Sequence, residues 1–163
     1  MNYHNITTDD MLNGSGLRTV LWVAGCEHKC PKCQNPITWD PNDGLLFDQS
    51  AMNELKQELS QPYISGLSLS GGDPMFTGNR TTILKICKEI KSEYPHKNIW
   101  MYTGYKYEEI QDEPVMQYID VLIDGKYVYQ LDDPKKHWAG SSNQRIINIS
   151  ETIKQGKIIT IQD

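Results

Sequence analysis

Three cysteines lie within eight residues of one another in the string GCEHKCPKCQN: Cys26, Cys30 and Cys33. Their spacing is C-x3-C-x2-C. Cysteine thiolates are the usual ligands of cubane iron–sulfur clusters, which normally take four of them. A loop that supplies only three leaves one iron with an open coordination position, where another molecule can bind. The spacing therefore predicts a [4Fe–4S] cluster with one reactive iron.

A structural zinc site is the main alternative, with His28, between two of the cysteines, as its fourth ligand. Structural zinc sites usually draw Cys or Cys/His pairs from two places in the chain, and no second pair is present here. We therefore favour the cluster and expect His28 to be an ordinary loop residue. The remaining cysteine, Cys87, falls on the apolar face of an expected helix, which favours a core position over a fourth ligand.

The turn Gly71-Gly72-Asp73-Pro74 follows an apolar stretch and is a second candidate site. Two glycines let the backbone turn sharply and approach a ligand closely. Its N–H and C=O groups would then bind a polar group such as an amino-acid moiety. A simple β-turn explains the same residues equally well.

The elements that must position these motifs alternate along the chain. Apolar runs predict strands at 18–24, 66–70, 98–103 and 119–123, and helices at 50–59, 79–94 and, broken near Pro114, 107–118; two late strands are expected at 145–149 and 157–161. Ser50 and Asn79 are the expected N-caps of the first two helices. This order predicts an α/β fold, with a mainly parallel sheet and helices on its outer face.

Both candidate motifs fall directly after an expected strand, as do Thr103-Gly104-Tyr105 and Asp124-Gly125. Chemistry in such folds gathers at the carboxyl ends of the strands. We therefore expect these four segments to form one site.

Composition narrows the class of protein. The 163 residues carry a formal net charge of −5, from 16 Lys and Arg against 21 Asp and Glu. There is no basic run that would follow a phosphate backbone, so we expect no nucleic-acid binding. The N-terminal stretch lacks a secretory signal, and the longest apolar run, 20–24, is too short to span a bilayer. We expect a cytoplasmic protein without a membrane partner, whose close cysteines bind metal or do redox work rather than form disulfides.

The cysteine motif after the first strand and GGDP after the second resemble the radical S-adenosylmethionine (SAM) enzymes. Further strings narrow the likeness, in this order: NGSGLRTVLWVAGCEHKCPKCQNPITW, SLSGGDPMF, WMYTGY, DVLIDGKY and W-x-GSSNQR. Over about residues 2–145 the chain is similar to the anaerobic ribonucleotide reductase activating proteins; residues 146–163 form an extension. The resemblance implies a single radical SAM domain over 1–163, folded as an incomplete βα barrel whose open side admits a protein substrate.

By this resemblance, Cys26, Cys30 and Cys33 bind the [4Fe–4S] cluster, and SAM chelates its fourth iron. The turn of Gly71, Gly72 and Asp73 would contact the methionyl amino group, mostly through backbone atoms. Three residues would line the adenine side: Lys32, Cys33 and Gln34. Lys32 stands where many such enzymes have an aromatic residue, and Asp73 where many have Glu.

The family activates a glycyl-radical enzyme. The resemblance implies that a flavodoxin-like donor supplies an electron, that SAM is cleaved reductively to methionine and a 5′-deoxyadenosyl radical, and that this radical abstracts a glycine Cα hydrogen from the anaerobic ribonucleoside-triphosphate reductase. Cluster and SAM carry this chemistry, so no catalytic side chain is expected. Activation of another glycyl-radical enzyme, and a non-catalytic iron–sulfur or zinc binding module, are the alternatives. The Trp138–Arg145 loop and the N-terminal turn at 13–18 are the expected docking elements.

Overall fold

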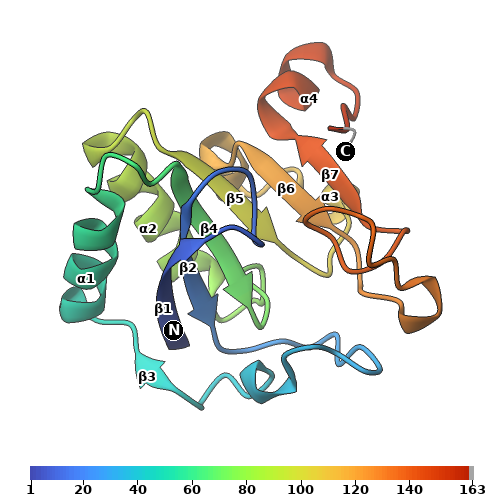
Figure 1. The fold of residues 1–163 in the computed structure, drawn as a ribbon, viewed down its shortest axis with the longest axis horizontal. Coiled ribbons are helices and arrows are strands. Elements are labelled where there is room, and N and C mark those ends of the chain that lie inside the picture. Colours follow the sequence, from blue (N-terminus) through green and yellow to red (C-terminus); the bar gives the residue numbers. More distant parts are fainter. Residues whose placement is uncertain (162–163) are drawn as a thin grey trace.

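The computed structural model describes residues 1–161, which form one open, seven-stranded mixed sheet with helices packed against it (Figure 1). The strands are β1 (Asn2–Asp10), β2 (Arg18–Val23), β3 (Leu45–Leu46), β4 (Gly66–Gly71), β5 (Asn98–Tyr102), β6 (Val121–Asp124) and β7 (Arg145–Asn148). Their order across the sheet is β3-β1-β2-β4-β5-β6-β7. Strands β2, β4, β5 and β6 run parallel, whereas β1, β3 and β7 are joined antiparallel. The sheet is therefore parallel in its centre and mixed as a whole.

The helices are α1 (Gln49–Leu59), α2 (Arg80–Glu93), α3 (Tyr107–Ile110) and α4 (Ile149–Gln155), with short 3₁₀ turns at Pro36–Thr38, Pro114–Tyr118 and Tyr129–Leu131. The buried positions of α1 and α2 recur at helical spacing. They pack on one face of the sheet, against alternate residues such as Leu21, Leu69 and Met101. Cys87 lies within this layer, fully buried, which confirms its expected core position.

The opposite face of the sheet is partly polar. A small apolar cluster of Trp100, Val121, Ile123 and Ile146 covers one part of it. Beside the cluster lies Arg18, which is fully buried. Its guanidinium donates to Ser68 Oγ and Asn98 Oδ1, both at 2.7 Å. Burial lowers the pKa of Arg18 to about 10, and its hydrogen bonds keep the buried group paired.

The four expected strands of the parallel centre are present, with ends that differ by one or two residues. The strand β1 is missing from the sequence-based prediction because its string NYHNITTDD is mostly polar and buries only Tyr3 and Ile6. The prediction of a late strand at 157–161 is wrong, since only an isolated β-bridge between Thr160 and Ile147 forms there. The regular structure of the extension 146–163 comes earlier, in the end of β7 and in helix α4. The last two residues of the extension lie outside the described part.

One of the two predicted N-cap positions is confirmed and the other is wrong. Asp48, not Ser50, caps α1, because its side chain accepts the Ala51 amide at 3.0 Å. Asn79 occupies the N-cap position of α2 without a capping hydrogen bond. Its side-chain amide instead donates to the carbonyls of Ala24 and Asp73. Asn79 thus links the ends of two strands. None of the helices within residues 1–161 has the length and apolar character of a membrane span.

Candidate iron–sulfur site

Four segments meet at one edge of the sheet, where β2, β4, β5 and β6 end. They are the cysteine loop (25–35), the glycine turn (71–74), the β5 turn (103–105) and the segment that follows β6 (124–128). Because these strands are parallel neighbours, their carboxyl ends place the four segments side by side.

Asp73 joins three of these segments. Its side chain is 1% exposed. Its Oδ2 lies 2.7 Å from His28 Nε2 and accepts the Thr103 hydroxyl and the Gly104 amide, both at 3.0 Å. Its Oδ1 accepts the Met75 amide at 2.8 Å. Both carboxylate oxygens are therefore used within the protein, and Asp73 fixes the cysteine loop to the turns after β4 and β5.

The contact with Asp73 settles the position of His28. Its ring is held between Asp73 and the Tyr105 ring, at a centroid distance of 4.6 Å from the latter. His28 was expected to be an ordinary loop residue; the structure shows in addition that it fixes the cysteine loop to Asp73.

The glycine turn packs tightly against the start of the cysteine loop. A Cβ on Gly71 would lie 2.6 Å from the backbone N and O of Val23, and one on Gly72 would lie 2.5 Å from the Gly25 carbonyl oxygen. Gly71 also has a φ of 103°, which disfavours other residues. The amides of Gly72 and Asp73 donate to the carbonyls of Val23 and Gly25, both at 2.8 Å. These two amides are therefore not free to bind a ligand, and a backbone contact from Gly72 or Asp73 to a ligand would have to come from a carbonyl oxygen, which suits an ammonium group.

The cysteine loop is held at its base and turns sharply at its tip. The amides of Gly25 and Cys26 donate to the carbonyls of Thr38 and Trp39 at 2.8 and 3.0 Å. At the tip, the Cys33 amide donates to the Cys30 carbonyl at 3.1 Å across Pro31 and Lys32. Lys32 has a φ of 57°, so Pro and a positive φ occupy the places they take in a type II turn.

The three thiols of this loop are free and half-buried. Burial raises the pKa of Cys26 to about 11, although the backbone amides of His28 and Lys29 lower it in part. Burial and the neighbouring Cys33 raise the pKa of Cys30, and the Tyr127 amide lowers it. The Asn35 amide donates to Cys33 Sγ at 3.4 Å.

Within residues 1–161, no three His, Cys, Asp or Glu side chains converge into a preformed metal-binding group. The donor set nevertheless fits a cluster: three thiols share one loop, near enough for Cys30 to raise the pKa of Cys26 and for Cys33 to raise that of Cys30. Soft thiolates are the ligands that iron–sulfur clusters require. Because the thiols must lose their protons to bind, cluster uptake is coupled to deprotonation of Cys26 and Cys30.

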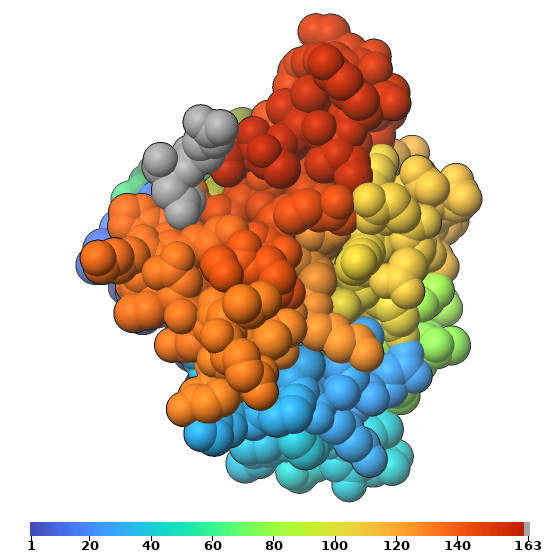
Figure 2. Space-filling model, turned by 90° about the vertical axis from the view of Figure 1, so that its right-hand side faces the viewer, coloured from blue at the N-terminus to red at the C-terminus, as the bar shows by residue number. Residues whose placement is uncertain are grey.

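The other predicted site residues lie on the outer side of the loop. Lys32 is exposed, and its Nζ is 3.5 Å from the centroid of the Tyr129 ring, which is a cation–π contact. Gln34 is also exposed. Figure 2 shows the blue surface around residue 30 directly beside the orange surface around residue 130. The chain after β6 therefore flanks the cysteine loop.

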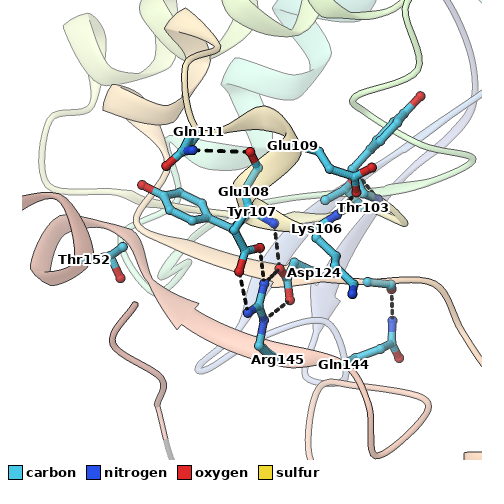
Figure 3. A network of polar contacts seen from close by, with 12 residues as sticks. Thr103, Lys106, Tyr107, Glu108, Glu109, Gln111, Asp124, Gln144, Arg145 and Thr152 are labelled. Carbon is cyan, nitrogen blue, oxygen red and sulfur yellow. Dashed lines mark hydrogen bonds and ion pairs between the residues drawn. The ribbon is translucent and has the colours of Figure 1, made fainter. Parts of the chain in front are cut away.

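Sequence reasoning missed the polar network that holds this later chain (Figure 3). Arg145, on β7, pairs with Glu108 at 2.7 Å and donates through Nε to Asp124 Oδ1 at 3.0 Å. Asp124 is 1% exposed and also accepts the Tyr107 amide. The GSSNQR string was the available signal for this network, because polar side chains in a loop either face a partner or bind the backbone.

The two expected docking elements lie at opposite edges of the sheet. Several polar side chains of the Trp138–Arg145 loop bind the protein's own backbone, and the Trp138 ring packs on Trp100 at 5.1 Å. The turn at 13–18 precedes β2 and so lies at the opposite edge of the sheet, where the Asn13 carbonyl accepts the Ser68 hydroxyl.

A three-thiol loop beside a glycine turn, at the carboxyl edge of a parallel sheet, defines the site of an iron–sulfur protein. A family model described as a 4Fe-4S single cluster domain matches residues 12–147, which contain all four segments.

Curated relatives narrow this class. Proteins called anaerobic ribonucleoside-triphosphate reductase-activating protein from Enterobacteria phage T4, Escherichia coli and Vibrio cholerae are 47%, 44% and 41% identical to the chain. The matches cover 90%, 88% and 90% of this chain and 93%, 96% and 97% of those proteins. The chain belongs to the family of anaerobic ribonucleoside-triphosphate reductase-activating proteins, which confirms the resemblance seen in the sequence.

Proposed function

We propose that the protein activates an anaerobic ribonucleoside-triphosphate reductase by generating a glycyl radical on it. The observation that carries the proposal is the three-thiol loop that Asp73 fixes beside the glycine turn, in a chain whose relatives are named as activating proteins of that reductase.

Cys26, Cys30 and Cys33 would hold a [4Fe–4S] cluster, and the carbonyls of the Gly71-Gly72-Asp73 turn would receive the methionyl amino group of SAM. Lys32, Cys33 and Gln34 would line the adenine. With one electron from a flavodoxin-like donor, a bound cluster would supply the reductive cleavage of SAM to methionine and a 5′-deoxyadenosyl radical, and this radical would take a hydrogen atom from a glycine Cα of the reductase.

The chain's own residues bind and orient. Asp73 holds the cysteine loop and the glycine turn at a fixed separation, because it contacts His28 while its own amide donates to the Gly25 carbonyl. Fixed separation matters because the reacting atoms must meet within about 3–3.5 Å. We further propose that residues 1–163 form a single domain and that the open sheet is a partial radical SAM barrel. A peptide loop of the reductase would enter through its open side.

Electron paramagnetic resonance (EPR) tests this function directly. The reconstituted protein, dithionite, SAM and the reductase should together yield a glycyl doublet on the reductase. Cys30→Ala should abolish the doublet. Cys87→Ala, a change on the buried face of α2, should retain it. Cleavage of SAM without a doublet would refute the reductase as partner, and a colourless protein with stoichiometric zinc would refute the cluster.

A further inference from the structure

The segment 124–128, which follows β6, is held by side chains of the loop at 140–145. Gln144 Nε2 donates to the Gly125 carbonyl at 3.0 Å, and Asn143 Nδ2 donates to the Lys126 carbonyl at 2.9 Å. The Val128 amide donates to the Ser141 hydroxyl at 3.1 Å. Three backbone groups of one short segment are thus bound by three side chains of a single loop.

The holding loop is itself held rigidly. Gln144 Oε1 accepts the amides of Gly140 and Ser141 at 2.9 and 3.1 Å, so both ends of this side-chain amide are used. Ser141 is fully buried. The next residue, Arg145, pairs with the buried Asp124 at the start of the segment (Figure 3). A side chain bound at both ends fixes its partner more firmly than a single surface contact does.

The segment so fixed lies against the cysteine loop. Tyr127 stands between two bound residues, Lys126 and Val128. Two residues further on, the ring of Tyr129 receives the Lys32 ammonium. Backbone amides and solvent access near the sulfurs are the means by which a protein tunes an iron–sulfur cluster.

We propose that Gln144 and Asn143 are positioning residues for the cluster: they hold the backbone at 125–127 beside the cysteine loop, which Tyr129 contacts through Lys32, so that this segment limits the access of water to the cluster sulfurs. The inference rests on the proposed function, because it takes Cys30 as a cluster ligand. Within the described residues, neither side chain hydrogen-bonds to the three cysteines, and both hold the backbone of the segment beside them.

The test compares Gln144→Met and Asn143→Ala with a matched control, Gln117→Met. The Gln117 side chain also donates to a backbone carbonyl, that of Pro114 at 2.9 Å, but it is exposed and belongs to another part of the fold. Each variant is reconstituted anaerobically. Iron release to a chelator and the midpoint potential of the cluster are then measured, the latter by EPR-monitored titration.

We expect iron release about tenfold faster in Gln144→Met, at the lower end of the effect of outer-shell substitutions on metal sites, and a smaller increase in Asn143→Ala. The midpoint potential should shift in Gln144→Met and stay at the parent value in Gln117→Met. A purely structural role would leave the potential unchanged. Unchanged potential, or release no faster than in Gln117→Met, would overturn the inference while leaving the glycyl-radical test of the parent protein intact. A parent protein that takes up no iron would instead refute the proposed function.

Discussion

Replacing Asp73 by Asn tests whether this carboxylate holds the site together. The substitution keeps the shape of the side chain but removes its charge and replaces one oxygen by an NH₂ group. In the parent, one oxygen faces His28, Thr103 and Gly104, and the other faces the Met75 amide. With the Asn oxygen on the first side, its NH₂ group opposes the Met75 N–H, which leaves buried donors without an acceptor.

The cost follows from these contacts. Hydrogen bonds to a charged group contribute about 1.5–3 kcal/mol, against about 0.5–1.5 for neutral pairs, and an unsatisfied buried donor costs about 1–3 kcal/mol. Because several bonds are weakened and one is lost, we expect Asp73→Asn to lower the free energy of unfolding by about 3–4 kcal/mol. For a chain of this size that corresponds to a melting temperature lower by about 10 °C.

Thermal unfolding of the metal-free protein, followed by circular dichroism, measures this loss. Iron uptake on reconstitution then reports whether the cysteine loop is still in place, and it should fall. The matched control is Asp43→Asn, an exposed carboxylate that accepts one backbone amide, from Gly44; it should change stability by less than about 0.5 kcal/mol. If Asp73→Asn melts with the parent and binds as much iron, Asp73 does not join the three segments.

Three other substitutions probe the surroundings of the site. Gly71→Ala would place a methyl carbon 2.6 Å from the β2 backbone, at a φ of 103°. We expect it to lower the free energy of unfolding, measured in urea, by about 3 kcal/mol or more. The control Gly156→Ala, at a glycine with positive φ but open space around it, should lower the same quantity by about 1 kcal/mol. Equal losses would contradict the packing argument. Arg145→Ala leaves the buried Asp124 without its cation and should cost about 3 kcal/mol by the same assay, whereas a loss below about 1 kcal/mol would show that Asp124 is satisfied without Arg145. Arg145 lowers the pKa of Glu108 from 4.5 to about 2, so this pair stabilises the fold above pH 4.5 and loses that contribution as pH falls toward 2. Glu108→Gln should reduce the loss of unfolding free energy between pH 4.5 and pH 2 by less than about 1 kcal/mol, because the carboxylate is largely exposed. An unchanged dependence of stability on pH in this range would refute the assignment to this pair.

The parallel centre of the fold was predictable because its signals are local. Apolar runs such as 18–24 and 66–70 mark strands that are buried on both faces, and each ends at a glycine or a turn. The antiparallel strands were less predictable. β1 alternates weakly and is stabilised by its pairing with β2 rather than by its own composition. The segment at 157–161 looks like a strand but follows α4 and forms only one bridge.

In the candidate site, too, the features with local sequence signals were predictable and those that depend on distant contacts were not. Cys26, Cys30 and Cys33 were predicted as cluster ligands from their spacing alone, because three thiols within eight residues must share a loop whatever the rest of the chain does; their ligation of a cluster stays a prediction. The glycines of the turn were predicted for close approach to a ligand, which stays a prediction; the structure shows that the backbone of β2 excludes a side chain at Gly71. The role of Asp73 was not predictable, since nothing local distinguishes a carboxylate that binds a ligand from one that binds the protein.

The sequence by itself determined the family, the loop that carries the three candidate thiols, and the edge of the sheet on which that loop lies, since each depends on residue types at short spacing or on ordered strings. The tertiary structure alone decided how the site is held. Asp73 reaches His28 and Thr103 across 45 and 30 residues of sequence, and Gln144 reaches Gly125 across 19. Such contacts depend on strand order and register, which bring the ends of β4, β5 and β6 together; no local pattern encodes which distant donor a buried acceptor will meet.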